Sequence, residues 1–126
     1  MAQEPESRSA LDGEAIARLL RLGGDDLAGR MAALFLGLAP ERLREARAGV
    51  AAGDGDQVRR EAHSLKSSSG NVGAYAVLEA AGQLGEAAEQ GDRPEALAPL
   101  LAALEAALEA ADPELRALAA RTERQA

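Results

Sequence analysis

The sequence predicts an all-α fold, and three observations lead to this prediction. Alanine and leucine, which are strong helix formers, dominate the chain, whereas the β-branched residues that favour strands are scarce. Apolar residues recur three or four positions apart, which is the spacing of one face of a helix. Glycine, proline and aspartate gather between these segments, where they provide turns and N-caps. The short connections favour antiparallel neighbours and therefore an up-and-down bundle.

Three helices are predicted in the first half of the chain. The first covers residues 12–22 and ends at Gly23-Gly24, and the second opens at the N-cap residue Asp25. Pro40 is expected to end the second helix and to occupy the first turn of the third, which stops near Gly53. The apolar stripes of the three helices consist of Ile16, Leu19, Leu20, Leu27, Met31, Leu34, Phe35, Leu38, Leu43, Ala46 and Val50.

The second half is predicted to hold three further helices and a short terminal one. The fourth helix starts near Asp56 and ends in the polar stretch 67–73, and the fifth and sixth cover residues 74–90 and 94–111. Asp112-Pro113-Glu114 is expected to provide the N-cap and first turn of a short last helix. The inward residues of these helices are Leu78, Ala81, Leu84, Ala88, Leu97, Leu100, Leu101, Leu104, Leu108, Leu115 and Leu118.

The composition narrows the class of function. The chain has 126 residues, the size of one domain, and a net charge of −7, which argues against nucleic-acid binding. Phe35 and Tyr75 are the only aromatic residues, too few for a base-stacking platform. No apolar run approaches the length of a membrane span, and no signal peptide is recognisable. The absence of cysteine excludes a disulfide and fits a cytoplasmic location, and residues 1–9 are predicted to be a disordered tail before a domain of residues 10–126.

The chain's one histidine, His63, is predicted to point away from the core of the fourth helix. Val58, Ala62, Leu65, Ser69 and Val72 are spaced to form one helix face. At ~100° per residue, the centre of that face lies roughly 140° from His63. This placement disfavours a structural core histidine and leaves an incidental surface residue as the alternative.

Cations and small residues surround the predicted position of His63. Arg59, Arg60 and Lys66 lie within one turn of it, and Ser67 and Gly70 follow on the same side. An exposed imidazole is largely neutral and nucleophilic near pH 7, and phosphoryl transfer needs little more than in-line placement and nearby positive charge. The pattern indicates a histidine that handles phosphate, with Lys66 and the two arginines as candidate charges. Solvated surface charge is the alternative for the three cations, and a fraying helix end is the alternative for the serines.

The stretch from Ala62 to Ala74, AHSLKSSSGNVGA, resembles the signature of the histidine-containing phosphotransfer (HPt) domain family. The flanks, Leu38 to Leu43 with Gly53-Asp54 and Leu84 to Asp92, resemble the family in the same register. The resemblance covers roughly residues 12–111. One departure is Ser67, because the position after the lysine is often glycine in the family.

The resemblance implies a four-helix bundle, here with additional short N-terminal and C-terminal helices. It implies that His63 accepts a phosphoryl group from an aspartyl phosphate of one receiver domain and passes it to another. Lys66 would steady the phosphoryl group, while Ser67 and Gly70 would keep the approach clear. The Ser67 hydroxyl is a candidate hydrogen-bond partner of the imidazole. The partners would be receiver domains of response regulators or hybrid histidine kinases, and these would supply the Mg²⁺, so that the chain needs no cofactor of its own.

Several alternatives remain open. The chain could be a helical adaptor without chemistry, or a phosphotransfer domain excised from a hybrid histidine kinase. A histidine-kinase dimerisation domain is disfavoured because Ser64, not an acidic residue, follows the histidine. We expect a monomeric phosphoryl carrier, not an autonomous enzyme, that docks through the face around His63. Exposed apolar residues of a neighbouring helix would widen that face; Leu19, Leu22 and Leu27 are candidates, with the core as the alternative location for each.

Overall fold

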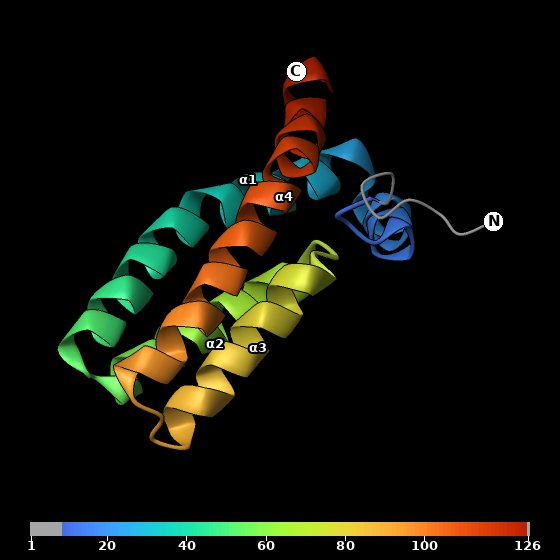
Figure 1. Ribbon diagram of the computed structural model, residues 1–126. Helices are drawn as coiled ribbons and strands as arrows, with labels where there is room; N and C mark the ends of the chain where they lie inside the picture. The colour runs from blue at the N-terminus through green and yellow to red at the C-terminus, as the bar shows by residue number, and fades with distance from the viewer. Residues whose placement is uncertain (1–8, 126) are drawn as a thin grey trace.

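The structure is a computed structural model that describes residues 9–125. In this part of the chain it contains four helices and no strand: α1 (Gly13–Ala52), α2 (Gly55–Asn71), α3 (Tyr75–Glu89) and α4 (Pro94–Gln125) (Figure 1). The prediction of an all-α fold is confirmed. None of these helices combines the length and the apolar character that crossing a membrane would require.

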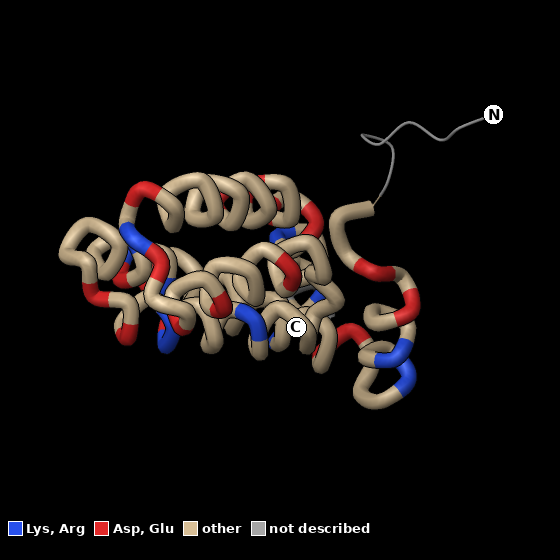
Figure 2. The backbone as a smooth tube through the Cα atoms, turned by 60° about the horizontal axis from the view of Figure 1, so that its bottom comes forward, with Lys and Arg blue, Asp and Glu red and all other residues tan. Residues whose placement is uncertain are grey.

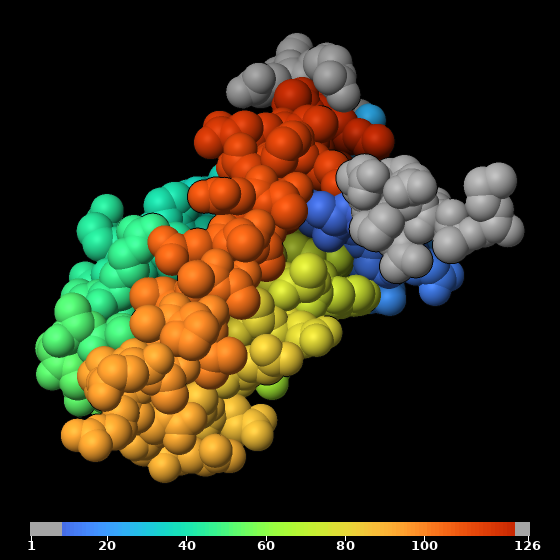
Figure 3. All heavy atoms as spheres, viewed as in Figure 1, coloured from blue at the N-terminus to red at the C-terminus, as the bar shows by residue number. Residues whose placement is uncertain are grey.

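The four helices pack in a ring. α1 packs beside α2 and α4, and α3 also packs beside α2 and α4, whereas the backbones of the diagonal pairs stay apart within the described residues. The space-filling view shows α4 lying between α1 and α3 on the face turned to the viewer (Figure 3). The ring encloses one apolar core, whose largest fully buried side chains are Phe35, Leu65, Leu84, Leu104, Leu115, Val58, Val72 and Val77.

α1 spans the three helices that were predicted for the first half of the chain. The predicted break at Gly23-Gly24 is present, because Gly24 has the non-helical angles φ 68° and ψ −163° and two helical segments meet there at a kink. The prediction that Pro40 ends a helix is wrong, because α1 continues through it to Ala52. An internal proline costs a helix roughly 3 kcal/mol, but Phe35 and Ala46 are buried on either side and their packing carries the helix onward.

Helix α4 likewise contains the short terminal helix that was predicted to be separate. It runs from Pro94 to Gln125 through Pro113, so the separate last helix is a wrong prediction. Its buried residues keep the spacing of one face across the proline, and Leu115 and Leu118 are buried as expected. The continuous stripe consists of Leu97, Leu101, Leu104, Ala111, Leu115 and Leu118. Because this buried stripe continues past Pro113, tertiary packing stabilises the helix at the position where Asp112-Pro113 predicts a turn.

The start of α1 is tied to two other parts of the fold. The predicted tail, residues 1–9, lies outside the described residues except for Ser9, whose hydroxyl donates to a carboxylate oxygen of Glu114 on α4. The backbone N–H groups of Ala10 and Leu11 donate to the same carboxylate. Asp12 N–H donates to the carbonyl of Gly73, between α2 and α3, at 2.8 Å. These bonds hold the beginning of α1 against α4 and against the connection between α2 and α3.

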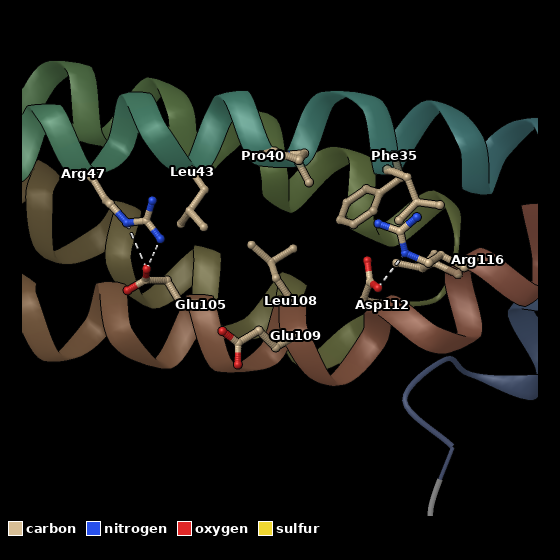
Figure 4. A pocket seen from close by; sticks show the side chains of 12 residues that line it. Phe35, Pro40, Leu43, Arg47, Glu105, Leu108, Glu109, Asp112 and Arg116 are labelled. Carbon is tan, nitrogen blue, oxygen red and sulfur yellow. Dashed lines mark hydrogen bonds and ion pairs between the residues drawn. The ribbon is translucent and has the colours of Figure 1, made fainter.

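A groove of about 340 Å³ lies between α1 and α4 (Figure 4). Phe35 and Leu108 point into it, and the ion pair between Arg47 and Glu105 bridges the two helices at one end. Its full lining is Phe35, Leu36, Ala39, Pro40, Leu43, Arg47, Glu105, Leu108, Glu109, Asp112, Leu115 and Arg116. None of the predicted site residues lies in this groove.

Candidate functional site

The orientation of α2 is fixed by its ends and its buried face. The side chain of Asp54 caps its N-terminus by accepting the N–H of Gln57 at 3.1 Å. The predicted inward residues, Val58, Ala62, Leu65, Ser69 and Val72, are all buried. His63 is exposed, so the predicted direction of the imidazole is confirmed. The one buried polar member of this face, Ser69, is satisfied because its hydroxyl donates to the carbonyl of Lys66 at 2.9 Å.

Two glycines of α3, which the sequence analysis did not single out, let this helix approach α2 beside the histidine. A Cβ atom added to Gly85 would lie 3.4 Å from the Cβ atom of Ala62. A Cβ atom on Gly82 would lie 3.7 Å from both Cδ and Cε of Lys66, so the lysine side chain extends across α3 at that point. The sequence contains these two glycines three residues apart, but only the packing of α3 against α2 shows that they allow the close approach of the two helices.

His63 borders a groove of about 230 Å³ between α2 and α3. Lys66 and Arg59 line the same groove, so the structure brings together three of the predicted site residues. The complete lining is Arg59, His63, Lys66, Ala81, Gly82, Gly85, Glu86 and Glu89. Arg60, Ser67 and Gly70 are not part of it. The carboxylates of Glu86 and Glu89 are additional site residues that the sequence analysis missed.

The two arginines that precede His63 are engaged with Asp56. Arg59 Nη2 lies 3.0 Å from Asp56 Oδ1, and Arg60 pairs with the other carboxylate oxygen. The hydrogen bond from Arg59 and the charge of Arg60 lower the pKa of the Asp56 carboxyl. Arg60 lies outside the groove and pairs with Asp56, which agrees with the alternative that it is only a solvated surface charge. Arg59 also pairs with Asp56, but it lines the groove beside His63.

Lys66 differs from these arginines because it forms no ion pair with any described residue. Elsewhere on the molecule cations and carboxylates are interspersed along the helices, and several pair within one helix turn (Figure 2). The Lys66 charge is therefore available to an anionic group at His63.

Ser67 and Gly70 lie beyond the groove, on the same helix. Ser67 is exposed, and no hydrogen bond joins its hydroxyl to His63 among the described residues. A Cβ atom on Gly70 would lie 3.3 Å from Leu78 Cδ1. The small size of Gly70 therefore serves the contact between α2 and α3, a role that the sequence analysis did not include.

Comparison with known proteins identifies the family. The Hpt domain family model matches residues 30–114, which contain the whole of α2 and α3. The chain belongs to the Hpt domain family. The structure is also similar to the crystal structure of histidine-containing phosphotransfer protein B (HptB) from Pseudomonas aeruginosa PAO1, with a TM-score of 0.73 and 27% sequence identity over 98% of this chain and 99% of that chain. A search of curated proteins found no match.

The family membership settles the class of function that the sequence predicted. This Hpt protein performs histidine phosphotransfer in a phosphorelay of two-component signalling. Its partners belong to the class of receiver domains, since Hpt domains work with these domains in phosphorelays.

Proposed function

We propose that His63 accepts a phosphoryl group from the aspartyl phosphate of one receiver domain and relays it to another response regulator. The observation that carries this proposal is that His63 is the one histidine of a chain whose family transfers phosphate on histidine. Its exposed position beside Lys66, which has no ion-pair partner within residues 9–125, supports the same assignment.

The imidazole attacks the phosphorus atom of the aspartyl phosphate with a nitrogen lone pair. As the N–P bond forms, the bond from phosphorus to the carboxyl oxygen breaks and the receiver regains its carboxylate. The proton on the second ring nitrogen stays in place, so the total charge is unchanged. Positive charge near the equatorial oxygens favours this step, and Lys66 supplies it from this chain.

Arg59 is the candidate for a supporting charge, since it lines the groove, although its pairing with Asp56 reduces what it offers to a phosphoryl group. Arg60 does not line the groove and is not a candidate for this supporting charge. Ser67 is exposed and small, which leaves room for a partner beside His63. Gly70 would contribute to this clearance indirectly, because it lets α3 lie close to α2. The Mg²⁺ would belong to the receiver domain, with no cofactor bound by this chain.

Exposed apolar side chains are candidates for the docking surface. Leu22 is 73% exposed, whereas Leu19 and Leu27 are partly buried, so only Leu22 of the three expected residues is largely accessible to a partner. Leu34 was expected in the core but is 65% exposed, and Tyr75 is 44% exposed. We expect these residues to contact the receiver domain, with the protein acting as a cytoplasmic monomer.

The proposal is tested by incubating the protein with phosphorylated receiver domains and Mg²⁺ and following labelled phosphate. We expect an acid-labile, alkali-stable label on the wild-type chain and none on His63→Gln. Label on both proteins, or on neither with a broad panel of receivers and correctly folded protein, would contradict the proposal and favour a helical adaptor without chemistry.

A further inference from the structure

Carboxylates as well as cations line the groove beside His63. Its groove is lined by the cations Arg59 and Lys66 and by the carboxylates Glu86 and Glu89. Arg59 is additionally held by the carboxylate of Asp56 at 3.0 Å. A phosphoryl group on His63 would therefore meet one charge that attracts it freely, that of Lys66, and two carboxylates that repel it.

The two carboxylates are not neutralised by an ion pair within the described part of the chain. Both Glu86 and Glu89 are exposed. Gly82 and Gly85 of α3 line the same groove and have no side chain to place in it. At these two positions α3 therefore adds no bulk to the groove that the carboxylates share with His63.

We propose that Glu86 and Glu89 raise the free energy of the phosphorylated state of His63 and so bias the phosphoryl group towards the receiver domain. The inference rests on the proposed function, since it assumes that His63 carries the phosphoryl group. With the ring proton retained, phosphorylation adds a net charge of about −1 to a groove that the carboxylates also line, and like charges repel even in water. In the onward step the N–P bond breaks, the O–P bond to the receiver aspartate forms, and this repulsion is relieved.

The bias is an equilibrium property, which separates it from an effect on docking or catalysis. A residue that only helps the two proteins to dock changes the forward and reverse rates by the same factor and leaves the final distribution unchanged. A residue that repels the bound phosphoryl group changes the distribution itself. Glu86 and Glu89 therefore lower the fraction of phosphoryl groups that the carrier holds at equilibrium, while Lys66 raises it.

The experiment measures the equilibrium ratio of phosphorylated carrier to phosphorylated receiver, approached from both directions, for wild type, Glu86→Gln, Glu89→Gln and the double variant. We expect the ratio to rise roughly threefold in each single variant and roughly tenfold in the double variant at low ionic strength. Salt near 1 M, where the screening length falls to about 3 Å, should remove most of the increase.

Glu109→Gln is the matched control, because it removes the same charge from the groove between α1 and α4 and should leave the ratio unchanged. An unchanged ratio in the double variant, with label still present on His63, would overturn this inference alone. If the variants changed the rates of transfer to and from the receiver by the same factor, this inference would also be overturned, because such a result indicates a role in docking. Absence of label on the wild-type protein would refute the proposed function, and this inference with it.

Discussion

The side chain of Lys66 on α2 lies across Gly82 on α3, with its Cδ and Cε atoms 3.7 Å from the point where a Cβ atom of residue 82 would stand. The glycine therefore leaves open the space through which the lysine reaches the groove beside His63. Any side chain longer than a methyl group at position 82 would compete with Lys66 for this space.

We predict that Gly82→Leu slows phosphotransfer by roughly tenfold to a hundredfold, because displacing a positioned charge by about 1 Å has effects of this size. Gly82→Ala should keep its transfer rate, since a methyl group makes only ordinary contact there. Gly37→Leu is the control for the added leucine, because Gly37 is an exposed residue of α1 and a Cβ atom there meets nothing within 4 Å. Single-turnover transfer rates would check this, and normal transfer by Gly82→Leu would show that the position of Lys66 is unimportant.

A second prediction concerns Gly73, which joins α2 to α3. Its φ is 70°, and a Cβ atom would lie 2.7 Å from the Cβ atom of Ala15. Gly91 has a similar φ of 83° with open space around it. We expect Gly91→Ala to lower the free energy of unfolding by about 1–2 kcal/mol through backbone strain alone.

Gly73→Ala should cost about 1–3 kcal/mol more than Gly91→Ala, because the start of α1 must also move away. Urea denaturation of the two variants gives both free energies of unfolding. Equal losses would mean that the close approach between Gly73 and Ala15 adds nothing to stability.

A third prediction concerns Pro40, which lies inside α1 and lines the groove between α1 and α4 (Figure 4). Since proline has no N–H, the carbonyl of Leu36 lacks its helical partner. Pro40→Ala should restore that hydrogen bond and raise the free energy of unfolding by about 1–3 kcal/mol.

Pro94→Ala is the matched control, because Pro94 opens α4, where the N–H has no helical partner anyway, and its change should stay within about 0.5 kcal/mol. Thermal unfolding of both variants measures the difference. A lower melting temperature for Pro40→Ala would show that α1 requires the proline for its path along α4.

A fourth prediction concerns pH and Glu114, which accepts hydrogen bonds from the start of α1. Partial burial raises the pKa of this carboxyl, but the hydrogen bonds from the Ser9 hydroxyl and from the Ala10 and Leu11 N–H groups outweigh burial and hold the pKa below its ordinary value of 4.5. A lowered pKa in the folded state stabilises the fold above the ordinary value, and this contribution disappears as the pH falls through the lowered pKa.

Glu114→Gln should therefore be less stable than the wild type near pH 7, with the difference shrinking as the pH falls below about 4.5. Denaturation at a series of pH values between neutrality and strong acid measures it. Glu109→Gln, on the same helix, should show no such convergence. Parallel pH profiles for Glu114→Gln and the wild type would contradict the role of the carboxylate.

The inward face of α2 and the exposure of His63 followed from the sequence because both depend on helical periodicity within a single helix. Glu86 and Glu89 could not be found in this way. They reach the histidine only through the packing of α3 against α2, and this depends on contacts such as that between Gly85 and Ala62. The exposure of His63 was therefore predictable from local pattern, whereas its electrostatic surroundings required the tertiary structure.

The predicted helix boundaries were wrong where local sequence signals conflicted with tertiary packing. Pro40 and Pro113 are strong local signals for a helix start, yet both lie inside long helices whose buried stripes continue on either side. Leu34 fits the apolar spacing of α1 but is exposed, because the stripe that reaches the core there passes through Ala32 and Phe35. In each case long-range contacts decided the outcome, and a single sequence contains no direct record of them.

The central claim is that His63 carries the phosphoryl group, and mass-spectrometric mapping of the phosphorylated protein under alkaline conditions tests it most directly. The wild-type protein, phosphorylated by a receiver domain, should carry one phosphoryl group on the peptide that contains His63. His63→Gln should carry none. A phosphoryl group on a serine such as Ser67, or one that persists in His63→Gln, would contradict the account.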